Sequence, residues 1–198
     1  MSSLLEKYKN GESIGYENYE KETLNNLKFQ LDAIEDVVLE KCELKNVSFR
    51  DLYMGKVTFK NCVLTNCYFM NVNASHVIFE DCKLTDVVFD EGKISHFKMI
   101  DSLVQFCTFS KEIIVDSQFV SRFISCTFEG VSLTSCDFQT SYFSELRIQA
   151  LNCDGVKLDK AKLDTIIGDI MSLKGATLSM TQALDIVMGI GIEIAELS

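Results

Sequence analysis

Side chains able to do chemistry are scarce in this 198-residue sequence, and its two histidines come first. His76 and His96 lie twenty residues apart, and Asp116 follows after another twenty. Two imidazoles and a carboxylate form a donor set that transition metals accept. A straight column on stacked strands, however, would spread its ends over roughly 10 Å, too far to converge on one ion. We therefore interpret the column as a solvated polar row and expect no metal or other cofactor.

No other group of residues suggests catalysis. The serine and threonine residues have no histidine placed beside them, so the sequence offers no pair of nucleophile and base. It also contains no glycine-rich loop of the kind that cradles phosphates. We predict that the protein is not an enzyme.

A five-residue repeat defines the elements that must position these side chains. From Leu24 to Leu178 a large apolar residue stands at nearly every fifth position, with one residue dropped between Phe119 and Phe123. Of the 32 positions in this series, only three hold anything else: Ala74, Cys153 and Gly168. A period of five fits neither the 3.6 of a helix nor the 2 of a strand, so it indicates a repeating structural unit.

The position two residues before each large residue prefers small or medium side chains. Seven of the eight cysteines, all but Cys153, fall on it, and no lysine or arginine of residues 22–178 occupies either position. We therefore expect two residues of every five to face inward. Cysteines placed in this way are typical of small buried hydrophobes rather than of disulfides or metal ligands. Free thiols predict a reducing, cytoplasmic location.

Units such as Cys42–Glu43–Leu44–Lys45–Asn46 and Ala161–Lys162–Leu163–Asp164–Thr165 resemble the pentapeptide-repeat family. The resemblance covers about 155 of the 198 residues. It implies an all-β, right-handed, square parallel β-helix solenoid with one repeat per side and four per coil. The 32 repeats then give about eight coils, and the sequence ends in a short capping helix.

Residues 92–123 depart from the pattern. The small position holds Gly92, Phe97 and Glu112, and the phase slips by one residue before Phe123. A glutamate cannot stay inside without a partner, so we expect a bulge or a short out-turned loop here. Qnr-type members of the family carry projecting loops that matter for contact with an enzyme. Nothing longer than a few residues could project from this chain.

We divide the chain into an N-terminal cap (residues 1–20), the β-helix (21–178) and a C-terminal module (179–198). Each end carries a capping-box pattern, Ser3-x-x-Glu6 and Ser179-x-x-Gln182. The second predicts a helix over residues 181–188, which Gly189 ends. Alternating isoleucines after it predict a short strand over residues 190–194.

The C-terminal module resembles the dimerising module of Qnr-type and related immunity proteins. Its apolar residues exceed what one end of a coil can cover, and exposed apolar patches mark interfaces. The alternative is that the helix simply plugs its own last coil. We expect a homodimer, and the candidate interface residues are Leu184, Val187, Met188, Ile190, Ile192 and Ile194.

Net charge is −10 and the isoelectric point about 4.7, which argues against direct nucleic-acid binding. We find neither a membrane-spanning segment nor a secretory signal. Resemblance to Qnr-type proteins implies an acidic mimic of duplex DNA that engages type II topoisomerases such as gyrase. The competing interpretation is an interaction scaffold with another partner and no topoisomerase role. The candidate partner-facing acidic patch is Glu80, Asp81, Asp86, Asp90 and Glu91.

Overall fold

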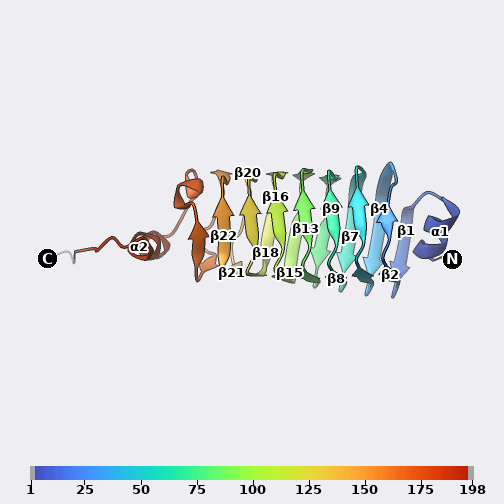
Figure 1. Ribbon diagram of the computed structural model, residues 1–198, viewed down its shortest axis with the longest axis horizontal. Helices are drawn as coiled ribbons and strands as arrows, with labels where there is room; N and C mark the ends of the chain where they lie inside the picture. Colours follow the sequence, from blue (N-terminus) through green and yellow to red (C-terminus); the bar gives the residue numbers. More distant parts are fainter. Residues whose placement is uncertain (1–2, 196–198) are drawn as a thin grey trace.

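The computed structural model describes residues 3–195, and it shows one long solenoid of parallel strands (Figure 1). Coils stack along the long axis, with helix α1 at one end and helix α2 at the other. About eight coils are present, as the count of repeats predicts. The resemblance also implies that the coil is right-handed, and this stays a prediction.

The strands belong to two sheets that wrap around the solenoid. The larger sheet contains β1 (Gly15–Glu20), β2 (Thr23–Asn25), β4 (Ala33–Glu40), β5 (Glu43–Lys45), β7 (Tyr53–Lys60), β8 (Val63–Thr65), β10 (Asn73–Ser75), β11 (Ile78–Glu80), β12 (Lys83–Thr85), β14 (Lys93–Ser95), β15 (Lys98–Gln105), β17 (Ile113–Val115), β18 (Gln118–Ile124), β20 (Ser132–Thr134), β21 (Tyr142–Ser144), β23 (Asn152–Asp154) and β24 (Lys162–Leu163). The smaller sheet contains β3 (Lys28–Phe29), β6 (Ser48–Arg50), β9 (Tyr68–Met70), β13 (Val88–Asp90), β16 (Thr108–Ser110), β19 (Thr127–Glu129), β22 (Leu146–Gln149) and β25 (Ile166–Gly168).

Each coil contains twenty residues. Leu24 pairs with Leu44, and Leu44 in turn pairs with Leu64. From Tyr16 to Gly155, nearly every fifth residue turns the chain through a left-handed backbone conformation; Asn61 and Asn66, for example, have φ of 53° and 52°. Asparagine tolerates this conformation better than most residues do. The coil therefore has four sides of five residues, separated by left-handed corners.

The core is a column of stacked side chains, and both inward positions of the repeat are buried as predicted. Thirteen of the fourteen phenylalanines are buried. Rings in neighbouring coils stack directly: Phe49 on Phe69 with centroids 4.9 Å apart, and Phe69 on Phe89 at 4.8 Å. Since offset stacking suits aromatic quadrupoles, the spacing of the strands also sets a favourable spacing of rings.

Cysteine and serine at the small inward position have a second role beyond their size. The backbone N–H at this position points inward and finds its acceptor on a side chain of the next coil. Cys42 N–H donates to the Cys62 sulfur at 3.4 Å, Cys62 N–H to the Cys82 sulfur at 3.4 Å, and Cys82 N–H to the Ser102 hydroxyl at 3.0 Å. All eight cysteines are buried free thiols, so their predicted structural placement is confirmed.

The phase slip is a deletion of one corner residue. Ile100 pairs with Val120, but Leu103 pairs with Arg122, so the register of β15 and β18 shifts by one. Strand β18 crosses the missing corner without turning outward. The expected bulge is therefore confirmed as an irregularity in the register of β15 and β18, whereas no out-turned loop forms over residues 92–123.

Two unusual inward residues in this region stay inside the core. Phe97 and Glu112 are both buried, and the Gly92 N–H donates to Glu112 Oε1 at 3.0 Å. A Cβ atom at position 92 would lie only 2.8 Å from Glu112 Oε2, so the absence of a side chain there makes the necessary room.

Helices cap both ends. Helix α1 (Leu4–Asn10) and helix α2 (Met180–Gly189) both begin with the predicted capping box, and a 3-10 helix, η1 (Ile170–Leu173), precedes α2. The ring of Tyr8 packs on Phe29 at 4.9 Å, so α1 covers the first coil. The predicted strand over residues 190–194 is wrong: this segment has no strand partner in the described chain, and a strand forms only when its backbone groups are paired.

Candidate interaction surfaces

The histidine column lies on one corner of the solenoid. The rings of His76 and His96 stack with centroids 4.6 Å apart and an interplanar angle of 1°. The Ser75 hydroxyl lies 2.9 Å from Nδ1 of His76. Within residues 3–195, no group of three or more histidine, cysteine or acidic side chains could hold a metal ion.

The five residues of the candidate acidic patch lie around a single coil. Asp81, Asp86 and Glu91 are successive left-handed corner residues, with φ of 52°, 54° and 59°. Glu80 and Asp90 directly precede the first and last of these corners. Neighbouring corners bound different sides of the coil, so the structure does not bring the five carboxylates together on one face.

Two residues of this patch also have cationic neighbours. Glu80 lies 3.6 Å from the ammonium of Lys60, and Glu91 lies 2.8 Å from that of Lys111. The hydrogen bond from Lys111 lowers the pKa of the Glu91 carboxyl. The negative charge of this coil is therefore partly neutralised at two of its three acidic corners.

Glu112 lies inside the same part of the solenoid and differs from these surface acids. Its Oε2 has no hydrogen-bond partner among the described residues, and its surroundings are mainly apolar. Burial raises the pKa of the Glu112 carboxyl to about 7, and the neighbouring charge of Asp90 acts in the same direction. The carboxyl group therefore titrates near neutral pH.

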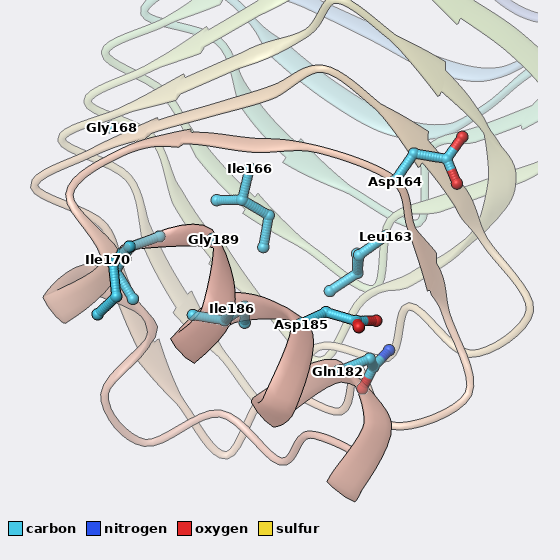
Figure 2. Close-up of a pocket in the computed structure, with 10 residues that line it drawn as sticks. Leu163, Asp164, Ile166, Gly168, Ile170, Gln182, Asp185, Ile186 and Gly189 are labelled. Carbon is cyan, nitrogen blue, oxygen red and sulfur yellow. The ribbon is translucent and has the colours of Figure 1, made fainter. Parts of the chain in front are cut away.

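The C-terminal module closes the last coil only in part. Gln182 of α2 donates from Nε2 to the carbonyl oxygens of Leu158 at 2.8 Å and Ala161 at 2.7 Å. Beside this contact a pocket of about 170 Å³ remains between α2 and the last strands (Figure 2). Leu163 and Ile166 line it from the solenoid side and are only half-buried. The helix thus leaves part of the terminal edge open.

The candidate dimer residues are mostly exposed, as an interface would require. Val187 is half-buried, while the other five are exposed: Leu184, Met188, Ile190, Ile192 and Ile194. Met180, at the start of the same helix, is 81% exposed and extends this apolar surface. The sequence predicts a helix that begins at residue 181, so Met180 is not among the candidate interface residues.

Phe106 is a second surface residue that the sequence analysis missed. It occupies a left-handed corner with φ of 55°, and 55% of it is exposed. The available signal was its position: it lies two residues after the inward Val104, where the other repeats carry mainly polar residues.

A parallel solenoid whose coils have four five-residue sides, each turned by a left-handed residue, is the fold of pentapeptide-repeat proteins. Among solved structures, one trypsin-treated single-residue variant of QnrB1, a plasmid-mediated fluoroquinolone resistance protein, aligns with a TM-score of 0.58 and 17% identity over 90% of this chain and 100% of its own. A second trypsin-treated QnrB1 variant aligns with a TM-score of 0.53 and 16% identity, over 89% and 99% of the two chains. At identities this low, the two structural alignments show a shared fold and nothing more.

Two further comparisons add no support to this result. The pentapeptide-repeat protein HetL, involved in heterocyst differentiation regulation in the cyanobacterium Nostoc sp. strain PCC 7120, aligns with a TM-score of 0.30 and 10% identity over 91% of this chain and 98% of its own, too loosely to support an argument. The sequence model of the SV2A/B/C luminal domain matches residues 17–109. No curated protein sequence matches the chain.

Proposed function

We propose that the protein acts without catalysis, by presenting a rigid surface to a type II topoisomerase such as DNA gyrase. The observation that carries this proposal is the likeness of fold to a trypsin-treated variant of QnrB1, a fluoroquinolone resistance protein, which spans 90% of this chain and 100% of that trypsin-treated chain. Resemblance of the C-terminal module to that of Qnr-type proteins points to the same partner.

Charge supports the proposal in a general way. The chain carries a net charge of −10, and surfaces that bind DNA are positively charged. A long acidic solenoid can therefore approach such a surface with electrostatic attraction. Its stacked coils hold their shape, so the entropic cost of ordering on binding is small.

An interaction scaffold with a different protein partner is the second candidate. It is favoured by the distribution of the acidic residues, which lie on three corners of one coil and partly face lysines. A protein that imitates the two phosphate rows of duplex DNA would need its acidic residues on one face. A scaffold that binds a different protein partner would not need them there.

A supercoiling assay and a quinolone-induced cleavage assay with purified gyrase test the two candidates. We expect the protein to change supercoiling activity, cleavage-complex formation, or both, with an effect that weakens as salt rises. Absence of any effect at concentrations in the tens of micromolar would reject the topoisomerase proposal and leave the scaffold.

We also infer that two copies pair through their C-terminal modules and that the protein works in the cytoplasm. The first inference rests on the exposed apolar residues of α2 and of the segment after it. The second rests on eight buried thiols, which a reducing compartment preserves. No helix within the described part of the chain is long and apolar enough to cross a membrane.

A further inference from the structure

Phe106 is an exposed aromatic residue at a corner of the solenoid. It is the single phenylalanine of the chain that lies outside the buried core, and its backbone is left-handed. A bulky residue with positive φ is an outlier, because its Cβ crowds the following carbonyl oxygen. The fold imposes this conformation at its corners, where 25 non-glycine residues adopt it, so the exposure of its ring is what sets Phe106 apart from the other phenylalanines.

The same corner column shows what would fit without strain. Three coils towards the N-terminus hold Asn26, Asn46 and Asn66, whose side-chain amides hydrogen-bond to one another along the solenoid at 2.9 Å and 2.7 Å. Phe106 cannot join such a row, and it packs no ring against another aromatic ring in the described chain. Its side chain therefore neither continues the amide row nor joins the stacked aromatic rings of the core.

The surroundings of Phe106 define the partner that it fits. Asp86 occupies the same corner one coil before it, and Ser125 and Glu145 occupy it one and two coils after it. The Ser125 hydroxyl donates to Glu145, but neither Asp86 nor Glu145 forms an ion pair with any side chain among residues 3–195. Half-buried Ile124 lies beside this corner, and the Phe106 N–H donates to its carbonyl oxygen at 3.0 Å.

Cationic groups are present on the adjoining side of the coil. Lys83 and Arg122 lie there, and the guanidinium of Arg122 is engaged over the Tyr142 ring at 5.6 Å. The ridge itself therefore presents an apolar ring between two carboxylates that no described cation neutralises. Aromatic residues that enter a pocket while charges meet at the rim are the usual anchors of protein interfaces.

We propose that Phe106 is the apolar anchor of the partner-binding ridge, and that the partner surface is an apolar pocket flanked by lysine or arginine side chains. This inference rests on the proposed function, since the DNA-binding surface of a topoisomerase supplies such cationic flanks. Asp86 and Glu145 meet these flanks, and Phe106 fixes the position of the solenoid along them.

The Phe106→Asn variant tests this inference against a matched control. Tyr16 is also an exposed aromatic residue in a left-handed corner, with φ of 56° and 78% exposure, but it lies in the first coil and on another corner. Binding of the full chain to immobilised, purified gyrase is measured by surface plasmon resonance, and folding is measured by urea denaturation. We expect Phe106→Asn to weaken binding at least about 30-fold and Tyr16→Asn to leave it within about 3-fold.

The denaturation midpoint separates a loss of binding from a loss of structure. Asparagine suits the left-handed corner, so the midpoint of Phe106→Asn should equal or exceed that of the original protein. Phe106→Ser, which matches Ser125 in the next coil, should behave in the same way and gives a second variant. Undiminished gyrase binding by both variants, or equal losses with Tyr16→Asn, would overturn the inference while leaving the proposed function intact. Failure of the original protein to bind gyrase would reject the proposed function itself and this inference with it.

Discussion

Glu112 places a carboxyl group inside a core of hydrocarbon, and Gly92 makes this possible. The glycine donates its N–H to one carboxyl oxygen and leaves room for the other. Desolvation opposes the charged form, so the carboxyl group is most easily accommodated when it carries a proton. A protonated carboxyl group can also donate a hydrogen bond from the oxygen that otherwise has no partner.

This arrangement predicts that stability falls as the pH rises. The pKa of Glu112 is raised in the folded state from 4.5 to about 7, so the folded protein binds more protons than the unfolded chain between these values. Stability from this group is fully present below pH 4.5 and is lost as the pH rises through 7, by an amount on the order of 3 kcal/mol. Urea unfolding at a series of pH values measures it.

Glu112→Gln is the matched control for that prediction. Glutamine keeps an acceptor for the Gly92 N–H and supplies a donor, but it does not ionise. The difference in unfolding free energy between the two proteins should grow in favour of glutamine as the pH passes from about 5 to about 8. A difference that stays constant over this range would show that Glu112 does not titrate as its environment indicates.

The core residues give a second prediction at this scale. Phe59 is fully buried and stacks on Phe79 with centroids 4.6 Å apart, so Phe59→Ala should lower the unfolding free energy by about 3–5 kcal/mol. Phe128→Ala should do the same, because Phe128 is stacked on Phe109 at 4.6 Å. Lys60 and Glu129 directly follow these two phenylalanines and face outward. Lys60→Ala and Glu129→Ala should therefore change the unfolding free energy by less than about 0.5 kcal/mol. Equal losses at both kinds of position in urea denaturation would contradict the assigned inward phase.

The sequence predicts which positions of the repeat face inward. It does not predict that Glu112 stays buried or that Phe106 lies exposed at a corner. A phenylalanine at every fifth position identifies a buried column because burial depends on that residue alone. Burial of Glu112 depends instead on Gly92, twenty residues earlier, which becomes its neighbour only when the coils stack. Phe106 escaped notice because a five-residue pattern specifies which residues face inward and says nothing about strain at the corners.

At the scale of elements, Gln182 provides the buried polar attachment of α2, beside the apolar contact that Ile186 makes with the core. Gln182 is buried and bonds two carbonyl groups of the last coil, Leu158 and Ala161, at the end of the solenoid. Gln182→Leu keeps much of the volume but leaves both carbonyls without this donor. We expect a loss of about 1–3 kcal/mol in urea denaturation.

The neighbouring Thr181 provides the control for this prediction. It is exposed on the same turn, so Thr181→Ala should leave stability almost unchanged. Hydrogen exchange adds a local measurement: in Gln182→Leu, amides of α2 should exchange faster, while amides of β7 and β11 should not. Uniform acceleration along the whole solenoid would mean that α2 is not a separate unit.

Elements at the two ends were predictable to different degrees. The helix predicted for residues 181–188 runs from Met180 to Gly189, because the capping box at Ser179 is a local signal. The strand predicted for residues 190–194 is absent. Alternating isoleucines indicate which side chains could share a face, but a strand also needs a partner, and no such partner is present in the described chain.

At the scale of the whole molecule, the geometry of the coil decides how charge is displayed. Residues that are close in sequence lie on different sides, whereas residues twenty apart lie in line. The acidic cluster over residues 80–91 therefore extends over two of the four sides of the solenoid, while Asp86, Phe106 and Glu145, far apart in sequence, share one ridge. Surface patches of a solenoid have to be sought with a period of twenty, and the single deletion between Phe119 and Phe123 shifts that period by one.

Assembly is the last property of the whole molecule that the structure allows us to predict. The exposed residues of α2 and the chain beyond it, Leu184, Met188 and Ile190 among them, form an apolar surface at one end of the long axis. A second copy related by twofold symmetry would cover this surface and produce a rod about twice as long, since an isologous interface matches the same patch on both chains. The same segment of the second copy would also offer residues 190–194 a strand partner, which they lack within one chain.

We expect a dimeric mass by light scattering at micromolar concentration. We expect a monomeric mass for the Leu184→Asp, Met188→Asp double variant, because the interface would then bury carboxylates that repel one another. Thr181→Ala and Lys60→Ala proteins should remain dimers. A monomeric mass for the unchanged protein would mean that the helix serves only to close its own coil.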